Sequence, residues 1–131
     1  MRTIRLGHGA SKALMAIMAV ITVFGVLTAC SAEPPIDPEL VEMTLSTEPE
    51  TVTAGTPAKL QATFSGVELS DDAQVTFDFR VGDEPKLVDA VRSGEGFDAD
   101  FTFPDKGIQT VYVHLYEGDL HLTKKKWVEV K

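Results

Sequence analysis

The chain has 131 residues, enough for one domain behind a short leader, and 44% of them are hydrophobic. Its 12 basic and 20 acidic residues give a formal net charge of −8, which argues against nucleic acid as a partner because nucleic-acid binding depends on basic patches. The single cysteine excludes an internal disulfide, so the fold must be stabilised by its core.

Residues 1–29 have the pattern of a bacterial secretory signal peptide. Basic residues at positions 2, 5 and 12 precede an apolar run at 13–26. This run is shorter than the about 20 apolar residues that a membrane-spanning helix needs. It leads into Leu27-Thr28-Ala29-Cys30, which matches the lipobox, the motif at which bacterial lipoproteins are cleaved and acylated. We therefore predict that residues 1–29 are removed and that Cys30 is lipidated.

Lipidation of Cys30 would place the rest of the chain on the extracytoplasmic face of the cell membrane. Two acyl chains make a lasting anchor, whereas one binds a membrane only marginally. Residues 30–39 then form a tether, because three prolines within it favour extended backbone. Without the leader, nine basic residues stand against twenty acidic ones, a net charge of −11.

From residue 40 onward, apolar and polar residues alternate with a period of two, which is typical of half-buried strands. Turn signals such as Gly82-Asp83-Glu84-Pro85 and Ser93-Gly94-Glu95-Gly96 separate the alternating segments. The predicted strands cover residues 40–45, 58–64, 74–81, 86–91, 97–103, 108–116 and 120–130.

Seven short strands with one apolar face each predict an all-β domain over residues 40–131. We expect an immunoglobulin-like antiparallel β-sandwich, with a small barrel as the alternative.

The C-terminal forty residues resemble the YtkA-like family. The resemblance is carried by Gly94-Glu95-Gly96-Phe97, Phe101-Thr102-Phe103, Asp105-Lys106-Gly107, Val111-Tyr112-Val113-His114, His121, Lys124-Lys125 and Val128-Glu129-Val130. It implies a small extracellular domain with an immunoglobulin-like sandwich, often carried by a lipoprotein, in a family without an established biochemical activity. Members often have methionines beside the second histidine, where this chain has Leu120, Leu122 and Thr123.

His114 and His121 are the sharpest candidates for chemistry. If the hairpin turn is centred on Glu117-Gly118, the two histidines lie directly opposite each other, with Cβ atoms about 5 Å apart. Two imidazoles at that distance can share a Cu²⁺ or Zn²⁺ ion. The alternative interpretation is that they are half-exposed residues on a sheet face. We expect no resident cofactor, with copper or zinc at this pair as the alternative.

Tyr112, Tyr116 and Trp127 are candidates for a ligand surface, because aromatic residues dominate binding hot spots. A single tryptophan in a small sandwich is more often part of the core, and we expect this for Trp127. The run Lys124-Lys125-Lys126 could contact lipid headgroups or an anionic wall polymer, but it fits better as protection of a sheet edge.

Catalysis has little support in the sequence. There is no nucleophile-elbow serine, phosphate-binding glycine loop or His-Glu metalloprotease motif. The acidic pairs Asp71-Asp72, Asp83-Glu84 and Asp98/Asp100 lack the spacing of a calcium loop. We therefore predict a non-catalytic, membrane-anchored module that recognises a protein or small ligand, with metal binding at the histidine pair as the alternative function.

Overall fold

The computed structural model describes residues 35–131, and residues 36–131 form one unit. The predicted signal peptide, Cys30 and most of the predicted tether therefore lie outside the described residues. Within residues 35–131 no helix is long and apolar enough to cross a membrane. The helix present there, η1 (Pro38–Leu40), has three residues and is capped by the side chain of Asp37.

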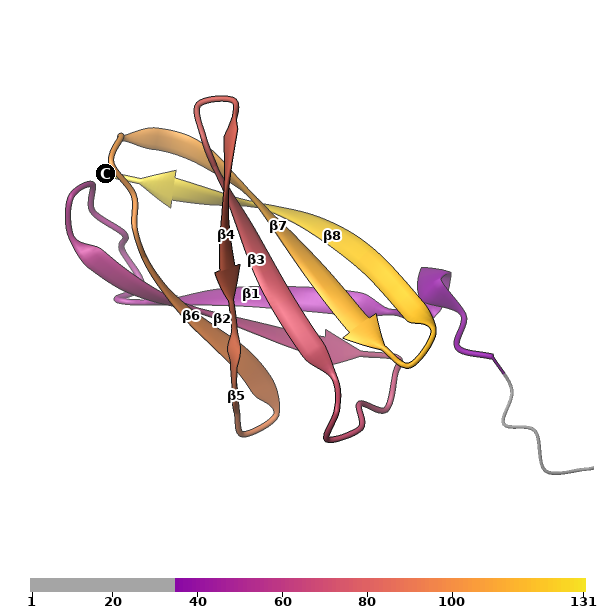
Figure 1. The fold of residues 1–131 in the computed structure, drawn as a ribbon. Helices are drawn as coiled ribbons and strands as arrows, with labels where there is room; N and C mark the ends of the chain where they lie inside the picture. Colours follow the sequence, from indigo (N-terminus) through magenta and orange to yellow (C-terminus); the bar gives the residue numbers. More distant parts are fainter. Residues whose placement is uncertain (1–34) are drawn as a thin grey trace, which may run out of the picture. The chain divides into compact units, whose positions relative to one another are not determined.

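Eight strands follow η1 (Figure 1). They are β1 (Glu42–Glu48), β2 (Pro57–Ser65), β3 (Gln74–Val81), β4 (Glu84–Asp89), β5 (Val91–Ser93), β6 (Gly96–Thr102), β7 (Gly107–Glu117) and β8 (Leu120–Val130).

The strands form two four-stranded antiparallel sheets, in the orders β1-β2-β6-β5 and β4-β3-β7-β8. These orders match the ABED and CFG sheets of an immunoglobulin-type sandwich, with β4 as an additional strand beside β3, which corresponds to strand C. The predicted fold class is confirmed. The barrel alternative is wrong, because each sheet has its own two edge strands.

The strand predicted at 86–91 is divided between the two sheets, so that eight strands are present where seven were expected. β4 pairs with β3, whereas β5 pairs with β6 in the other sheet. Figure 1 shows β5 continuing the line of β4 after the short break at Ala90. The amide N–H of Ala90 donates to the carbonyl of Val75 at 2.9 Å, which holds the chain where it leaves one sheet for the other.

The core lies between the sheets and is built from the inward residues of the alternating strands. Phe77, Phe79, Phe97 and Phe103 are essentially fully buried. The ring of Phe79 stacks on that of Phe101 with centroids 4.0 Å apart and meets Phe103 edge-on at 5.7 Å. Met43 of β1 is also buried. This aromatic core supplies the stability that a chain without a disulfide needs.

Candidate functional site

The candidate site is the outward face of the β4-β3-β7-β8 sheet, which we call the aromatic face. Because side chains alternate along a strand, burying Val111, Val113 and Leu115 turns their neighbours outward. The same alternation on β8 turns outward the residues that flank Leu122 and Val128. The aromatic face thus collects the sequence-predicted residues His114, His121, Tyr112, Tyr116 and Trp127.

The hairpin between β7 and β8 sets the register of this face. Its loop is Gly118-Asp119, closed by the pair Glu117 and Leu120, and Gly118 has φ +55°. A glycine at the first central position is what a type II′ turn requires, whereas the predicted turn centred on Glu117-Gly118 would place a non-glycine residue there. The pairing is therefore shifted by two residues from the predicted one.

This shift corrects the predicted opposition of the two histidines. His114 lies opposite Thr123, and His121 lies opposite Tyr116. Because the shift is an even number, every side chain stays on its predicted face, and the histidines become diagonal neighbours. Their ring centroids are 5.8 Å apart, so the structure still brings the pair together.

Each histidine has a defined neighbour on the opposite strand. Nδ1 of His114 lies 2.9 Å from Oγ1 of Thr123, within hydrogen-bonding distance. The ring of His121 stacks on Tyr116, with centroids 4.3 Å apart and planes at 20°. Within residues 35–131 no group of three or more His, Cys, Asp or Glu residues is placed to hold a metal ion. Among these residues, the histidine pair is therefore joined by no third ligand of those four types.

A second feature of the aromatic face is a row in which cations and aromatic rings alternate. The guanidinium of Arg80 lies 5.2 Å from the ring centroid of Tyr112, and Nζ of Lys125 lies 5.4 Å from that of Trp127. Tyr112 and Lys125 are directly opposite each other, so that the row crosses β3, β7 and β8. Such cation–π contacts fix the orientation of flat rings on an open surface.

Trp127 is exposed, and the expectation that it belongs to the core is wrong. Its exposed fraction is 68%, and that of Tyr116 is 41%. The ring of Trp127 borders a shallow cleft of about 270 Å³ that also contains Leu45, Thr47 and Glu50. The signal for its orientation was in the sequence, since alternation counted back from Val128 places Trp127 outward.

The lysine run on β8 is divided between two faces. Lys124 and Lys126 are paired with the core residues Val113 and Val111 and are on the inner side of this edge strand, whereas Lys125 is on the aromatic face. Inward-pointing lysines on an edge strand prevent it from pairing with another chain. Among the described residues, no carboxylate forms a salt bridge with any of these three lysines.

Asp78 was not singled out by the sequence, although it lies at the centre of the aromatic face. It is 3% exposed and accepts a hydrogen bond from Nη2 of Arg80 at 2.8 Å, while its other carboxylate oxygen has no partner among the described residues. Alternation places Asp78 outward, but its burial depends on the neighbouring strands, where Leu87 and Tyr112 lie directly opposite it. The sequence pattern gives no sign of that burial.

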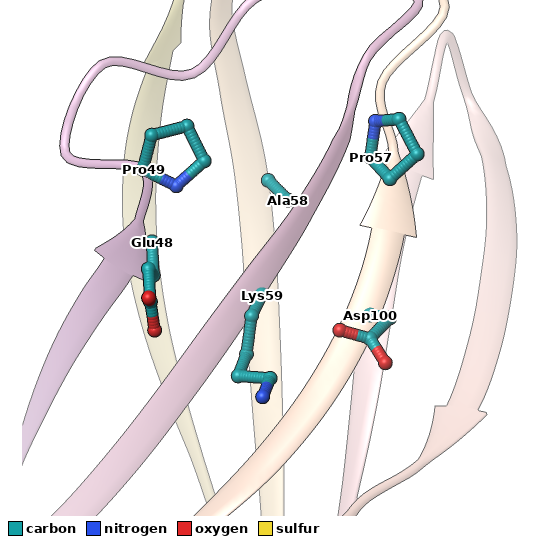
Figure 2. A pocket seen from close by; sticks show the side chains of 6 residues that line it. All are labelled: Glu48, Pro49, Pro57, Ala58, Lys59 and Asp100. Carbon is teal, nitrogen blue, oxygen red and sulfur yellow. The ribbon is translucent and has the colours of Figure 1, made fainter.

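The outward face of the other sheet has a different chemistry. Lys59 lies directly opposite both Glu48 and Asp100, in a shallow cleft of about 450 Å³ that Figure 2 shows. Beside it, Gln61 donates to Asp98 at 2.9 Å. The residues lining this cleft include no aromatic side chain, and a cation stands among its carboxylates. We therefore place the candidate site on the aromatic face.

Fold and site together define a small all-β sandwich that presents aromatic, imidazole and cationic groups on one sheet. A comparison with protein-family models gives no match, and a comparison with curated proteins gives none. A solved crystal structure of an engineered protein is similar, with a TM-score of 0.51 and 15% identity over 69% of this chain. This chain spans only 20% of that protein's length, and the likeness shows the fold alone.

Proposed function

We propose that the protein is a lipid-anchored, extracytoplasmic binding module of YtkA-like type that recognises its ligand through the aromatic face and carries out no catalysis of its own. The leader, the lipobox and Cys30 support the location. The exposure of Trp127 and Tyr116 supports the choice of face, because exposed aromatic rings commonly anchor binding surfaces.

The observation that carries this proposal is the contrast between the two outward faces. Trp127 and Tyr116 are exposed on one sheet, and Leu87 and Ile108 extend the same face with exposed fractions of 67% and 65%. On the other sheet, Val91 is the exposed large hydrophobic residue within the described strands. An asymmetric distribution of apolar surface is typical of a molecule with one binding side.

Site-specific photo-cross-linking in intact cells tests this proposal. A photoreactive phenylalanine analogue replaces Trp127 in one variant and Val91 in the matched control, which is equally exposed on the opposite sheet. We expect a discrete cross-linked product at position 127 that is absent at position 91. Equal products at both positions, or none at 127, would contradict the choice of face.

A second candidate function is binding of Cu²⁺ or Zn²⁺ by His114 and His121. It is favoured by their 5.8 Å ring separation and by the contact between Nδ1 of His114 and Thr123. A hydrogen bond from Nδ1–H to that hydroxyl leaves Nε2 with its lone pair available, which is the usual arrangement of a histidine that binds metal.

Metal titration of the protein with these ions tests the second candidate. His114→Ala and His121→Ala should each abolish the saturable site, and Thr123→Ala should weaken it by about tenfold through loss of the orienting bond. Asp100→Asn on the opposite sheet serves as the control for weak cation uptake by the acidic surface. If the histidine variants bind metal as well as Asp100→Asn does, the pair is not a metal site.

A further inference from the structure

The carboxylates of the aromatic face already have partners within the protein, whereas one of its cations has no carboxylate partner among the described residues. Its carboxylates are engaged, since Asp78 pairs with Arg80 at 2.8 Å, Glu129 with Lys131 at 2.7 Å, and Asp89 accepts a hydrogen bond from Thr76 at 3.1 Å. Lys125, by contrast, has no carboxylate within salt-bridge distance among residues 35–131. Arg80 and Lys131 are used in these pairs, so within this part of the chain Lys125 is the cation of this face that is free to meet an anionic ligand.

The aromatic rings of this face are spread out rather than gathered in a pocket. Tyr116 lies opposite His121, and Trp127 is six residues further along β8, which at the rise of a strand is about 20 Å. Tyr112 and Lys125, directly opposite each other, lie between these ends, and Arg80 contacts the Tyr112 ring from β3. A small ligand cannot contact both ends of such a row, whereas an extended polymer can contact all of it.

We propose that the aromatic face binds an anionic polysaccharide, a sugar polymer that carries carboxylate or phosphate groups. This inference rests on the proposed function and specifies its ligand. The flat, exposed rings of Trp127 and Tyr116 pack against the apolar faces of sugar rings, and Lys125 between them pairs with the acidic groups. Arg80 keeps 38% of its side chain exposed and extends the cationic row beyond its own bond to Asp78.

The overall negative charge of the domain does not prevent this binding at physiological salt. Interactions between exposed charges are largely screened beyond about 8 Å at that ionic strength. The field that a sugar bound beside Lys125 meets is therefore set by the charges close to that lysine and not by the distant carboxylates. At low salt the distant carboxylates repel a polyanion as well, so that binding is strongest at intermediate ionic strength.

Fluorescence of the single tryptophan, Trp127, reports binding directly in the purified full chain held in detergent micelles. The probes are polygalacturonate, an anionic sugar polymer, neutral dextran, which lacks the charge, and polyglutamate, which lacks the sugar rings. We expect a saturable change with polygalacturonate alone. Equal responses to dextran or polyglutamate would overturn the proposal, and so would a stronger response to vesicles of anionic phospholipid.

Matched variants locate the binding on this face. Retention on a polygalacturonate column should weaken by about tenfold or more for Trp127→Ala and by about threefold or more for Lys125→Gln. Lys59→Gln removes the same charge from the opposite sheet, and Val91→Ala removes an exposed apolar group there; both should bind within about twofold of the unmodified chain. If Lys59→Gln weakens retention as much as Lys125→Gln, the proposal is wrong.

The two proposals can fail separately. A cross-linked partner at position 127 in a protein that binds none of the polymers would refute the polysaccharide and leave the binding face intact. Polymer binding that survives both Trp127→Ala and Lys125→Gln would refute the face itself.

Discussion

The register of the β7–β8 hairpin can be tested by the coupling between its cross-strand side chains. Tyr116 and His121 are directly opposite, with ring centroids 4.3 Å apart and planes at 20°, whereas His114 and His121 are diagonal at 5.8 Å and 44°. Opposed pairs in antiparallel strands contribute about 0.2–1 kcal/mol. Because Tyr116 is 41% exposed, we expect about 0.5 kcal/mol for its coupling with His121.

Two double-mutant cycles measure this difference. The first combines Tyr116→Ala with His121→Ala, and the second combines His114→Ala with His121→Ala, with free energies of unfolding taken from urea denaturation followed by circular dichroism. The diagonal pair should couple by less than about 0.2 kcal/mol, below the range of directly opposed pairs. If the coupling of the two histidines exceeds that of Tyr116 and His121, the strands pair in the register centred on Glu117-Gly118, and our account of the turn is wrong.

Three further predictions concern the core, the glycines and the local charge. Phe79→Ala should lower the free energy of unfolding by about 3–5 kcal/mol, because the ring is fully buried. Trp127→Ala should change it by at most about 0.5 kcal/mol, because that ring is exposed. Equal losses of stability for the two variants in urea denaturation would contradict these assignments. Gly66→Ala should lower the melting temperature more than Gly118→Ala, because a Cβ at Gly66 would lie 2.1 Å from the carbonyl oxygen of Leu40 while one at Gly118 meets nothing within 4 Å. Similar decreases in melting temperature for the two variants would show that the positive φ of each glycine, and not the contact with Leu40, determines the loss of stability. At low salt, iodide should quench the fluorescence of Trp127 more strongly than caesium does despite the net negative charge of the chain, because Nζ of Lys125 is 5.4 Å from the ring centroid. Lys125→Gln should reduce the difference in quenching between the two ions. Stronger quenching by caesium in the unmodified chain would refute this prediction.

The sequence was sufficient for most of the fold because the strands are amphipathic. The alternation Val75, Phe77, Phe79 and Val81 on one strand and Phe97, Ala99, Phe101 and Phe103 on another leaves a single choice of buried face. The segment 86–91 has no such alternation, since Leu87, Val88, Ala90 and Val91 offer apolar groups to both faces. That segment is where the chain changes sheets, and its division between β4 and β5 depends on long-range pairing that no local pattern encodes.

The candidate site was predictable in its members but not in its arrangement. Face membership follows from strand periodicity, which an even shift in register does not change, so that His114, His121, Tyr112 and Tyr116 share a surface in either register. The choice between the two registers depends on whether Gly118 takes the first or the second central position of the turn, and in the structure it takes the first, with φ +55°. The buried position of Asp78 depends on its neighbours in three strands and could not be read from one of them.

Strand β8 combines two requirements that explain why its lysines are consecutive. On its inner side, valines at 124 and 126 would complete an apolar stripe from Leu122 to Val130 on an 11-residue edge strand, a surface that could pair with a second copy of the chain. Lysines there remove that risk, and they would be selected whether or not the protein binds an anion. Lys125 is on the other face, where protection of the edge gives no reason for a cation. The proposed ligand binding of the aromatic face therefore has to be tested at Lys125 alone. A substitution of all three lysines could also cause aggregation through the inner side of β8, and a loss of ligand binding could then not be attributed to the aromatic face.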